Sequence, residues 1–170
     1  MKFLFCFISV LICGNLLAQP PRVELAPTGF APIKVSIPAT DTKKLVDLSA
    51  EWAKAYNKNV RGADVTDVTE NSMKISAYKS NGFFYRERGE TFYHKIRYTV
   101  ELHFYSDHYG LQFTVNDIYA DDDVLLDYNL HNYFTSDGKM KEGYTGLKSS
   151  IEDTVNDIIQ SHYKFITNYR

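Results

Sequence analysis

Cysteine is almost absent from this chain of 170 residues, and both of its cysteines, Cys6 and Cys13, stand near the N-terminus. The rest of the sequence can form no disulfide and offers neither a thiol nucleophile nor a cysteine-based zinc site. A strong charge of either sign is also missing, because the net charge is −2. Composition therefore gives no electrostatic reason to expect a nucleic-acid partner.

Catalytic motifs are missing as well. The sequence has no Gly-rich phosphate loop, no Gly-x-Ser-x-Gly elbow and no helical His-x-x-x-His pattern. The run Asp121-Asp122-Asp123 lacks the alternating spacing of a calcium loop and is interpreted as a solvated acidic turn. His94 and His103 are an odd number of residues apart on one expected strand, so they face opposite sides. We therefore predict a protein that is not an enzyme and that holds no cofactor or metal.

The first residues have the pattern of a targeting signal. Lys2 precedes an apolar run over 3–13, and Ala18 is a small residue at a plausible cleavage site. We predict a signal peptide over 1–18 and export to the periplasm or beyond. The apolar run is shorter than the ~20 residues of a membrane span, which favours a cleaved signal. No transmembrane segment is predicted after cleavage. A lipoprotein cut before Cys13 is the alternative, which the bulky Ile12 disfavours.

Residues 19–32 contain four of the five prolines and little apolar pattern, so we predict a Pro-rich, extended and mobile leader. Residues 33–170 are predicted to form a single domain of ordinary length.

The clearest pattern in that domain is a long hairpin over 91–119. Apolar side chains alternate with polar ones on both sides of a short Asp- and Gly-containing loop, which is typical of two half-buried antiparallel strands. The apolar positions are Ile96, Tyr98, Val100, Leu102, Phe104, Leu111, Phe113 and Val115. One face of this hairpin needs a cover, and the other is polar and aromatic.

Two amphipathic helices can supply the cover. Leu45, Leu48 and Trp52 follow helical spacing after the N-cap candidates in 40–42, which predicts a helix to about residue 59. The second helix is predicted to begin between residues 146 and 150, where Ser149 and Glu152 have capping-box spacing. Its apolar stripe includes Ile151, Val155 and Ile158, with His162 as a core residue.

Shorter segments complete the order of elements. Strands are predicted over 33–37 and 73–77, residues 60–69 form a less distinct strand, and Asn81-Gly82 is interpreted as a turn. Residues 120–146 are irregular, and their aromatic side chains indicate that this loop packs on the body. The prediction is an α+β fold, β-α-β-β-β-β-α, with one antiparallel sheet and both helices on one face.

The chain resembles the Bacteroidota domain-of-unknown-function family 4468 over the whole length that follows the signal. The resemblance depends mainly on 42–56 and on 100–118, where SDHYGLQFTVNDI (106–118) stands in place of a family strand-turn-strand. Family members often show Lys-Asp-Gly there, whereas no glycine directly follows Asp107 in this chain. The resemblance implies a TATA-binding-protein-like (TBP-like) fold and export, and it implies no chemistry, because the family has no assigned activity.

The open face of the sheet and the 120–146 loop are the candidate binding surfaces, because Arg and aromatic residues are enriched where protein surfaces bind. The candidate site residues are Lys95, Arg97, Thr99, Glu101, His103, Tyr105 and Tyr128. The expected partner is a protein or a small ligand. One alternative is a lipid carrier with a cavity between a curved sheet and the last helix, and another is an envelope structural protein.

Overall fold

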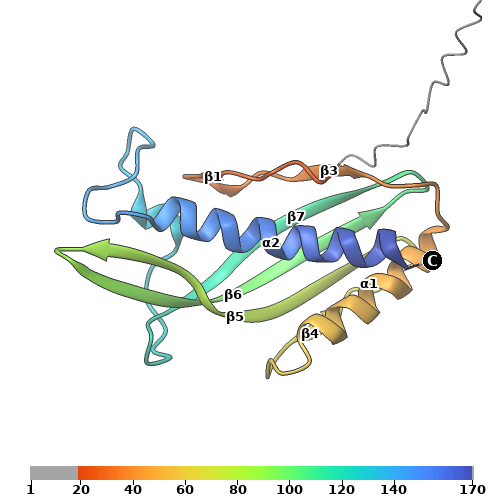
Figure 1. Ribbon diagram of the computed structural model, residues 1–170, viewed down its shortest axis with the longest axis horizontal. Coiled ribbons are helices and arrows are strands. Elements are labelled where there is room, and N and C mark those ends of the chain that lie inside the picture. Colours follow the sequence, from red (N-terminus) through yellow and green to blue (C-terminus); the bar gives the residue numbers. More distant parts are fainter. Residues whose placement is uncertain (1–18, 170) are drawn as a thin grey trace, which may run out of the picture.

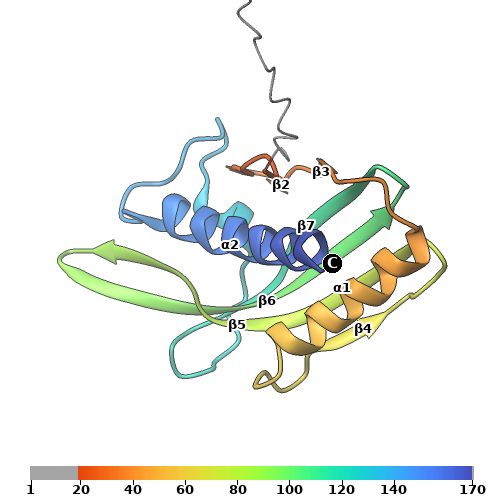
Figure 2. The same ribbon diagram turned by 45° about the vertical axis from the view of Figure 1, so that its right-hand side comes forward.

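A computed structural model describes residues 19–169, and the predicted signal peptide lies outside the described residues. A five-stranded antiparallel sheet with the order β3-β7-β6-β5-β4 forms one layer, and a two-stranded β1-β2 hairpin flanks it (Figures 1 and 2). The strands are β1 Leu25–Ala26, β2 Gly29–Phe30, β3 Ile33–Ser36, β4 Asp64–Thr66, β5 Ser72–Glu87, β6 Glu90–Phe104 and β7 His108–Tyr119. The helices are α1 Thr42–Tyr56 and α2 Leu147–Asn168, with a short 3-10 helix, η1, at Leu130–Tyr133.

The predicted hairpin is the centre of this sheet. Strands β6 and β7 pair from Lys95↔Tyr119 to Phe104↔Tyr109, and a bulge at Asn116 shifts the register between Arg97 and Tyr98. The apolar positions of β6 from 96 to 104 are all buried, as their alternation predicts. The bulge keeps the pattern inward at the far end of β7, where Ile118 is buried.

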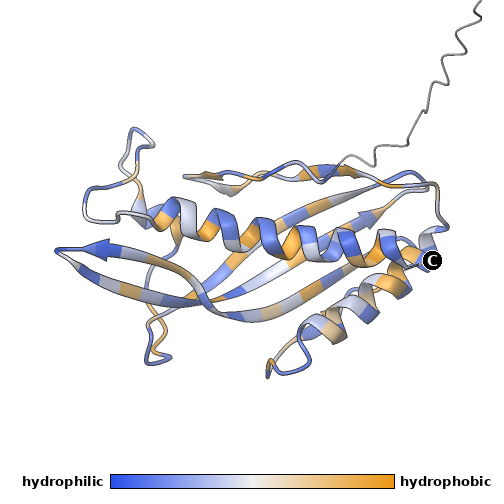
Figure 3. Ribbon diagram, in the orientation of Figure 1, coloured by the Kyte–Doolittle hydropathy of each residue, from blue (hydrophilic) through white to orange (hydrophobic). Residues whose placement is uncertain are grey.

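Both helices cover the same face of the sheet (Figures 1 and 2). Their apolar stripes face inward while their solvent sides are hydrophilic (Figure 3). Asp41 caps α1 by accepting a hydrogen bond from the backbone N–H of Lys44. No helix within residues 19–169 is long and apolar enough to cross a membrane. The predicted order β-α-β-β-β-β-α with two helices on one face is confirmed.

The prediction of a turn at Asn81-Gly82 is wrong, because β5 runs through this position as one strand with an irregular register between Lys79 and Phe83. Asn81 adopts a positive φ of 51°, which serves the irregularity in place of a turn. Gly82 lies so close to Ile96 that a Cβ would stand 2.7 Å from Ile96 Cγ1. Beyond Lys95, where the pairing of β6 with β7 ends, β5 and β6 continue as a two-stranded arm (Figure 1).

The prediction of a mobile leader over 19–32 also needs correction. Val23, Leu25 and Phe30 are buried in the hydrophobic core. The Asn156 side chain accepts a hydrogen bond from Val23 N–H (2.9 Å) and donates one to Val23 C=O (3.0 Å), as a neighbouring strand would. The prolines therefore belong to a segment that is docked on the core.

The predicted capping box of α2 does not form. Gly146, with φ 86°, is the N-cap, and no side chain caps the helix. Ser149 Oγ donates to Gly146 C=O, while Glu152 Oε1 accepts from Leu25 N–H at 2.7 Å. Glu152 thus ties β1 to α2, and it does not cap the helix.

The 120–146 loop packs on the body, as its aromatic residues predict. Leu130, Tyr133 and Phe134 are buried. The short η1 helix begins with a capping box between Asn129 and Asn132. The loop therefore fills the end of the core near the β5–β6 arm.

Candidate functional site

The open sheet face is the surface opposite the two helices, and Arg97 is its central charged side chain. Arg97 lies directly across from Asp117 in the β6–β7 register, and its Nη1 donates to Asp117 Oδ2 at 3.2 Å. The Arg97 side chain keeps 47% exposure and that of Asp117 keeps 29%. The guanidinium therefore retains donors for a partner while its position is set by the sheet.

Neutral and charged contacts continue along this face. Thr99 Oγ1 donates to Asn116 Oδ1 at 2.8 Å and lies 3.0 Å from Ser76 Oγ. Glu101 is 3.9 Å from Lys74 Nζ, a loose and partly exposed pair. Cross-strand pairs of this kind contribute little energy individually, so the positions of these polar side chains are set mainly by the sheet register.

Lys95 has the most elaborate surroundings of the predicted site residues. Its ammonium lies 5.2 Å from the ring centre of Tyr78 and 5.1 Å from that of Tyr119. It also pairs with Asp123 Oδ1 at 2.5 Å, which brings the acidic turn of the 120–146 loop to the open sheet face. Burial and the neighbouring Tyr78 raise the pKa of Tyr119, so its phenol stays neutral beside this cation.

The other predicted site residues are not all brought together. His103 is exposed on the same face, while Tyr105 lies just beyond the end of β6 and stacks on His108 with ring centres 4.4 Å apart. Tyr128 packs edge-on against Tyr133 of the 120–146 loop, with ring centres 5.6 Å apart. Tyr128 therefore does not belong to the row formed by the other candidates.

An aromatic cluster between the arm and the loop was missed by sequence reasoning. His94 stacks on Phe83 at 4.7 Å, and Tyr133 and Tyr144 pack edge-on at 4.8 Å. Burial lowers the pKa of His94. The density of aromatic residues in 83–94 was the available signal, but their grouping depends on the path of the 120–146 loop. Phe92 and Tyr93 remain 38% and 45% exposed on the arm.

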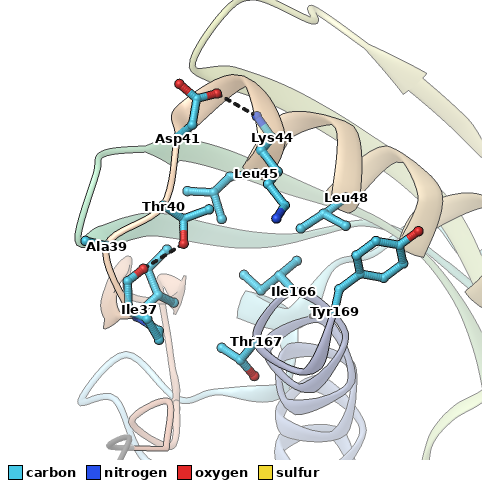
Figure 4. A pocket seen from close by; sticks show the side chains of 11 residues that line it. Ile37, Ala39, Thr40, Asp41, Lys44, Leu45, Leu48, Ile166, Thr167 and Tyr169 are labelled. Atoms are coloured by element: carbon cyan, nitrogen blue, oxygen red, sulfur yellow. Dashed lines mark hydrogen bonds between the residues drawn. The ribbon is translucent and has the colours of Figure 1, made fainter.

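A pocket of about 360 Å³ lies where the start of α1 meets the end of α2 (Figure 4). Leu45, Leu48 and Ile166 give it apolar walls, and Lys44 and Tyr169 lie at its rim. The carboxylate of Asp41 already accepts a hydrogen bond from a free amide of the α1 terminus, so an incoming anion would meet its charge.

A Ser–His pair exists between the helices but is enclosed. Ser49 Oγ and His162 Nε2 are 2.9 Å apart, and His162 Nδ1 is 3.4 Å from Tyr109 Oη. All three side chains are buried at 1% exposure or less, which leaves no access for a substrate. His162 is a core residue, as predicted. Among residues 19–169, no three His, Asp or Glu side chains are grouped to hold a metal ion.

Two solved structures share this fold. A DUF4468 family protein from Bacteroides ovatus ATCC 8483 has a TM-score of 0.55 and 8% identity, covering 80% of this chain and 82% of its own. A TBP-like protein from Parabacteroides distasonis ATCC 8503 has a TM-score of 0.59 and 12% identity, covering 82% of this chain and 93% of its own. These likenesses confirm the α+β, TBP-like fold, and neither protein's name states an activity. No protein-family model and no curated protein matches the sequence.

Proposed function

We propose that this protein is an exported, non-enzymatic binding module that recognises a protein partner through the open sheet face. The observation that carries the proposal is Arg97, which pairs with Asp117 on the neighbouring strand and is still about half exposed on β6, the middle strand of the sheet. Rigid placement lowers the entropy lost on binding, and Arg is enriched at interface hot spots. Export is proposed from the signal pattern over 1–18.

The lipid-carrier alternative has less support. The space between the sheet and α2 is occupied by large side chains with 2% exposure or less, including Tyr98, Tyr109 and Phe113 from the sheet. Ile151 and Val155 of α2 are also fully buried. A fatty acid between these layers would have to displace a close-packed core, which is costly.

Affinity capture from envelope and periplasmic extracts of the native host tests the proposal. Purified wild-type protein is the bait beside Arg97→Ala, Glu101→Ala and Tyr128→Ala, with quantification of the captured proteins. We expect Arg97→Ala to change the free energy of unfolding by no more than about 1 kcal/mol, because its ion pair is partly exposed. The same variant should lose a partner that wild type retains.

Tyr128→Ala is the control for the loop. If only this variant abolishes capture, the open sheet face is not the binding surface and the 120–146 loop takes its place. If all three variants still capture structural proteins of the envelope, the structural-protein alternative is favoured.

A further inference from the structure

The ion pair between Lys95 and Asp123 differs from that between Arg97 and Asp117 in where its carboxylate resides. Asp117 lies on β7, directly opposite Arg97, so the sheet register holds the two side chains together. Asp123 belongs to the turn after β7, and its side chain is 70% exposed. The carboxylate on Lys95 is therefore the one that can exchange.

Lys95 itself is held independently of Asp123. Its side chain is only 25% exposed, and the rings of Tyr78 and Tyr119 both lie within about 5 Å of its ammonium. Cation–π contacts of this kind fix a partly desolvated cation in place. If the Asp123 carboxylate moves away, an oriented positive charge is left between two aromatic rings.

The turn that carries Asp123 also has its own hydrogen bonds. Asp123 N–H donates to Ala120 C=O at 3.0 Å, and Ala120 N–H donates to Val124 C=O at 2.9 Å. Neither bond involves the Asp123 carboxylate. Rotation of one side chain can therefore release Lys95 while the turn keeps its shape.

We propose that Lys95, with Tyr78 and Tyr119, is a binding site for a carboxylate side chain from an acidic segment of a protein partner. Asp123 is the intramolecular competitor that occupies this site until the partner displaces it. The ammonium is positively charged and already holds a carboxylate, so we expect its ligand to be a carboxylate as well. This inference rests on the proposed function, because it specifies one position of the open sheet face and how that position is regulated.

A fluorescently labelled hexaglutamate peptide is the probe, measured by anisotropy at low ionic strength, where surface charges are least screened. We expect Asp123→Asn to raise its affinity about two- to sixfold, the range over which a partly exposed ion pair can compete. Lys95→Met should weaken binding at least about tenfold in both the wild-type and the Asp123→Asn backgrounds. Lys95→Gln, a polar but uncharged replacement, is measured as a second variant. Melting curves of both Lys95 variants check that they are folded.

Asp122→Asn is the matched control, because it removes the same charge from the same turn. Asp122 Oδ1 accepts a hydrogen bond from Val124 N–H, a role that asparagine retains. The control should bind within twofold of wild type, and hexaglutamine should not bind.

Equal gains from Asp122→Asn and Asp123→Asn would show a general charge effect and overturn the competitor assignment. Unchanged binding by both Lys95 variants would overturn the carboxylate site, and polyphosphate binding as tightly as hexaglutamate would overturn the peptide assignment. The capture experiment with Arg97→Ala decides the proposed function separately, since Arg97 is not part of this exchangeable pair.

Discussion

The hydroxyl of Ser49 and the Nε2 atom of His162 lie 2.9 Å apart in the core and join α1 to α2. Trp52 packs edge-on against the same imidazole, with ring centres 5.0 Å apart. The helical layer thus contains a polar contact whose members have no access to water.

Ser49→Ala is expected to lower the free energy of unfolding by about 1–3 kcal/mol, because it leaves a buried imidazole nitrogen without its hydrogen-bond partner. Urea unfolding measures this change. Lys54→Ala on the exposed side of α1 is the control and should stay within about 0.5 kcal/mol of wild type. Equal stability of both variants would mean that the Ser49–His162 contact contributes nothing.

The buried His162 also predicts that the folded protein loses stability in acid. Burial lowers the pKa of His162 to about 3, against about 6.5 in an unfolded chain. Between these values the unfolded state binds a proton that the folded state does not, so stability falls as the pH falls through this window. The slope from this group is about 1.4 kcal/mol per pH unit.

His162→Gln removes the titrating group. The difference in unfolding free energy between wild type and this variant, measured from pH 7 to pH 4, isolates the histidine from other titrating groups. We expect wild type to lose its advantage progressively below about pH 6.5. A difference that does not change with pH would contradict the buried, neutral state of His162.

Gly82 predicts a steric coupling across the sheet. A Cβ at this position would stand 2.7 Å from Ile96 Cγ1, so Gly82→Ala should cost about 1–3 kcal/mol through overpacking. Ile96→Ala alone should cost about 2–5 kcal/mol. In the double variant the clash is gone, and the cost should fall below the sum by at least about 0.5 kcal/mol. If the losses in unfolding free energy measured by chemical denaturation are additive, the backbone between Lys79 and Phe83 relaxes around the added methyl group without help from the Ile96 substitution.

Asn156 predicts how the N-terminal segment docks. Asn156→Ala removes the side chain that bonds both backbone groups of Val23, so residues 22–30 should exchange amide hydrogens faster while the β6–β7 hairpin stays protected. Hydrogen-exchange mass spectrometry resolves the two regions. Asp157→Ala, next to it on the exposed side of α2, should leave exchange unchanged. Uniformly faster exchange would indicate global destabilisation.

The sheet and helices could be predicted because their signals are local. Alternation from Ile96 to Phe104 and the three- and four-residue spacing after Leu45 each lie within one element. The docking of Val23 could not be predicted, because its partner Asn156 is 133 residues away. Asn81-Gly82 could be predicted as a turn but not as an irregularity within β5, since a turn and a bulge need the same unusual backbone.

The candidate site was predictable in its outward row but not in its pairing. Alternation alone places Lys95, Arg97 and Glu101 on one face. The Arg97–Asp117 pair depends on the bulge at Asn116, which sets the register of β7. Contact between Lys95 and Asp123 depends on the course of an irregular turn, for which the sequence carries no periodic signal.

The docking of β1 on α2 has a kinetic consequence. Leu25 of β1 contacts Glu152 and Ser49 of α1 contacts His162, so both segments complete these contacts when α2 is present. During synthesis, the part of the apolar sheet face that α2 covers stays exposed until α2 emerges. Contacts at such sequence separation slow folding, because the loop must close before any of its contact energy is gained. Before α2 is made, the nascent chain therefore exposes apolar surface, the state that a holding chaperone binds.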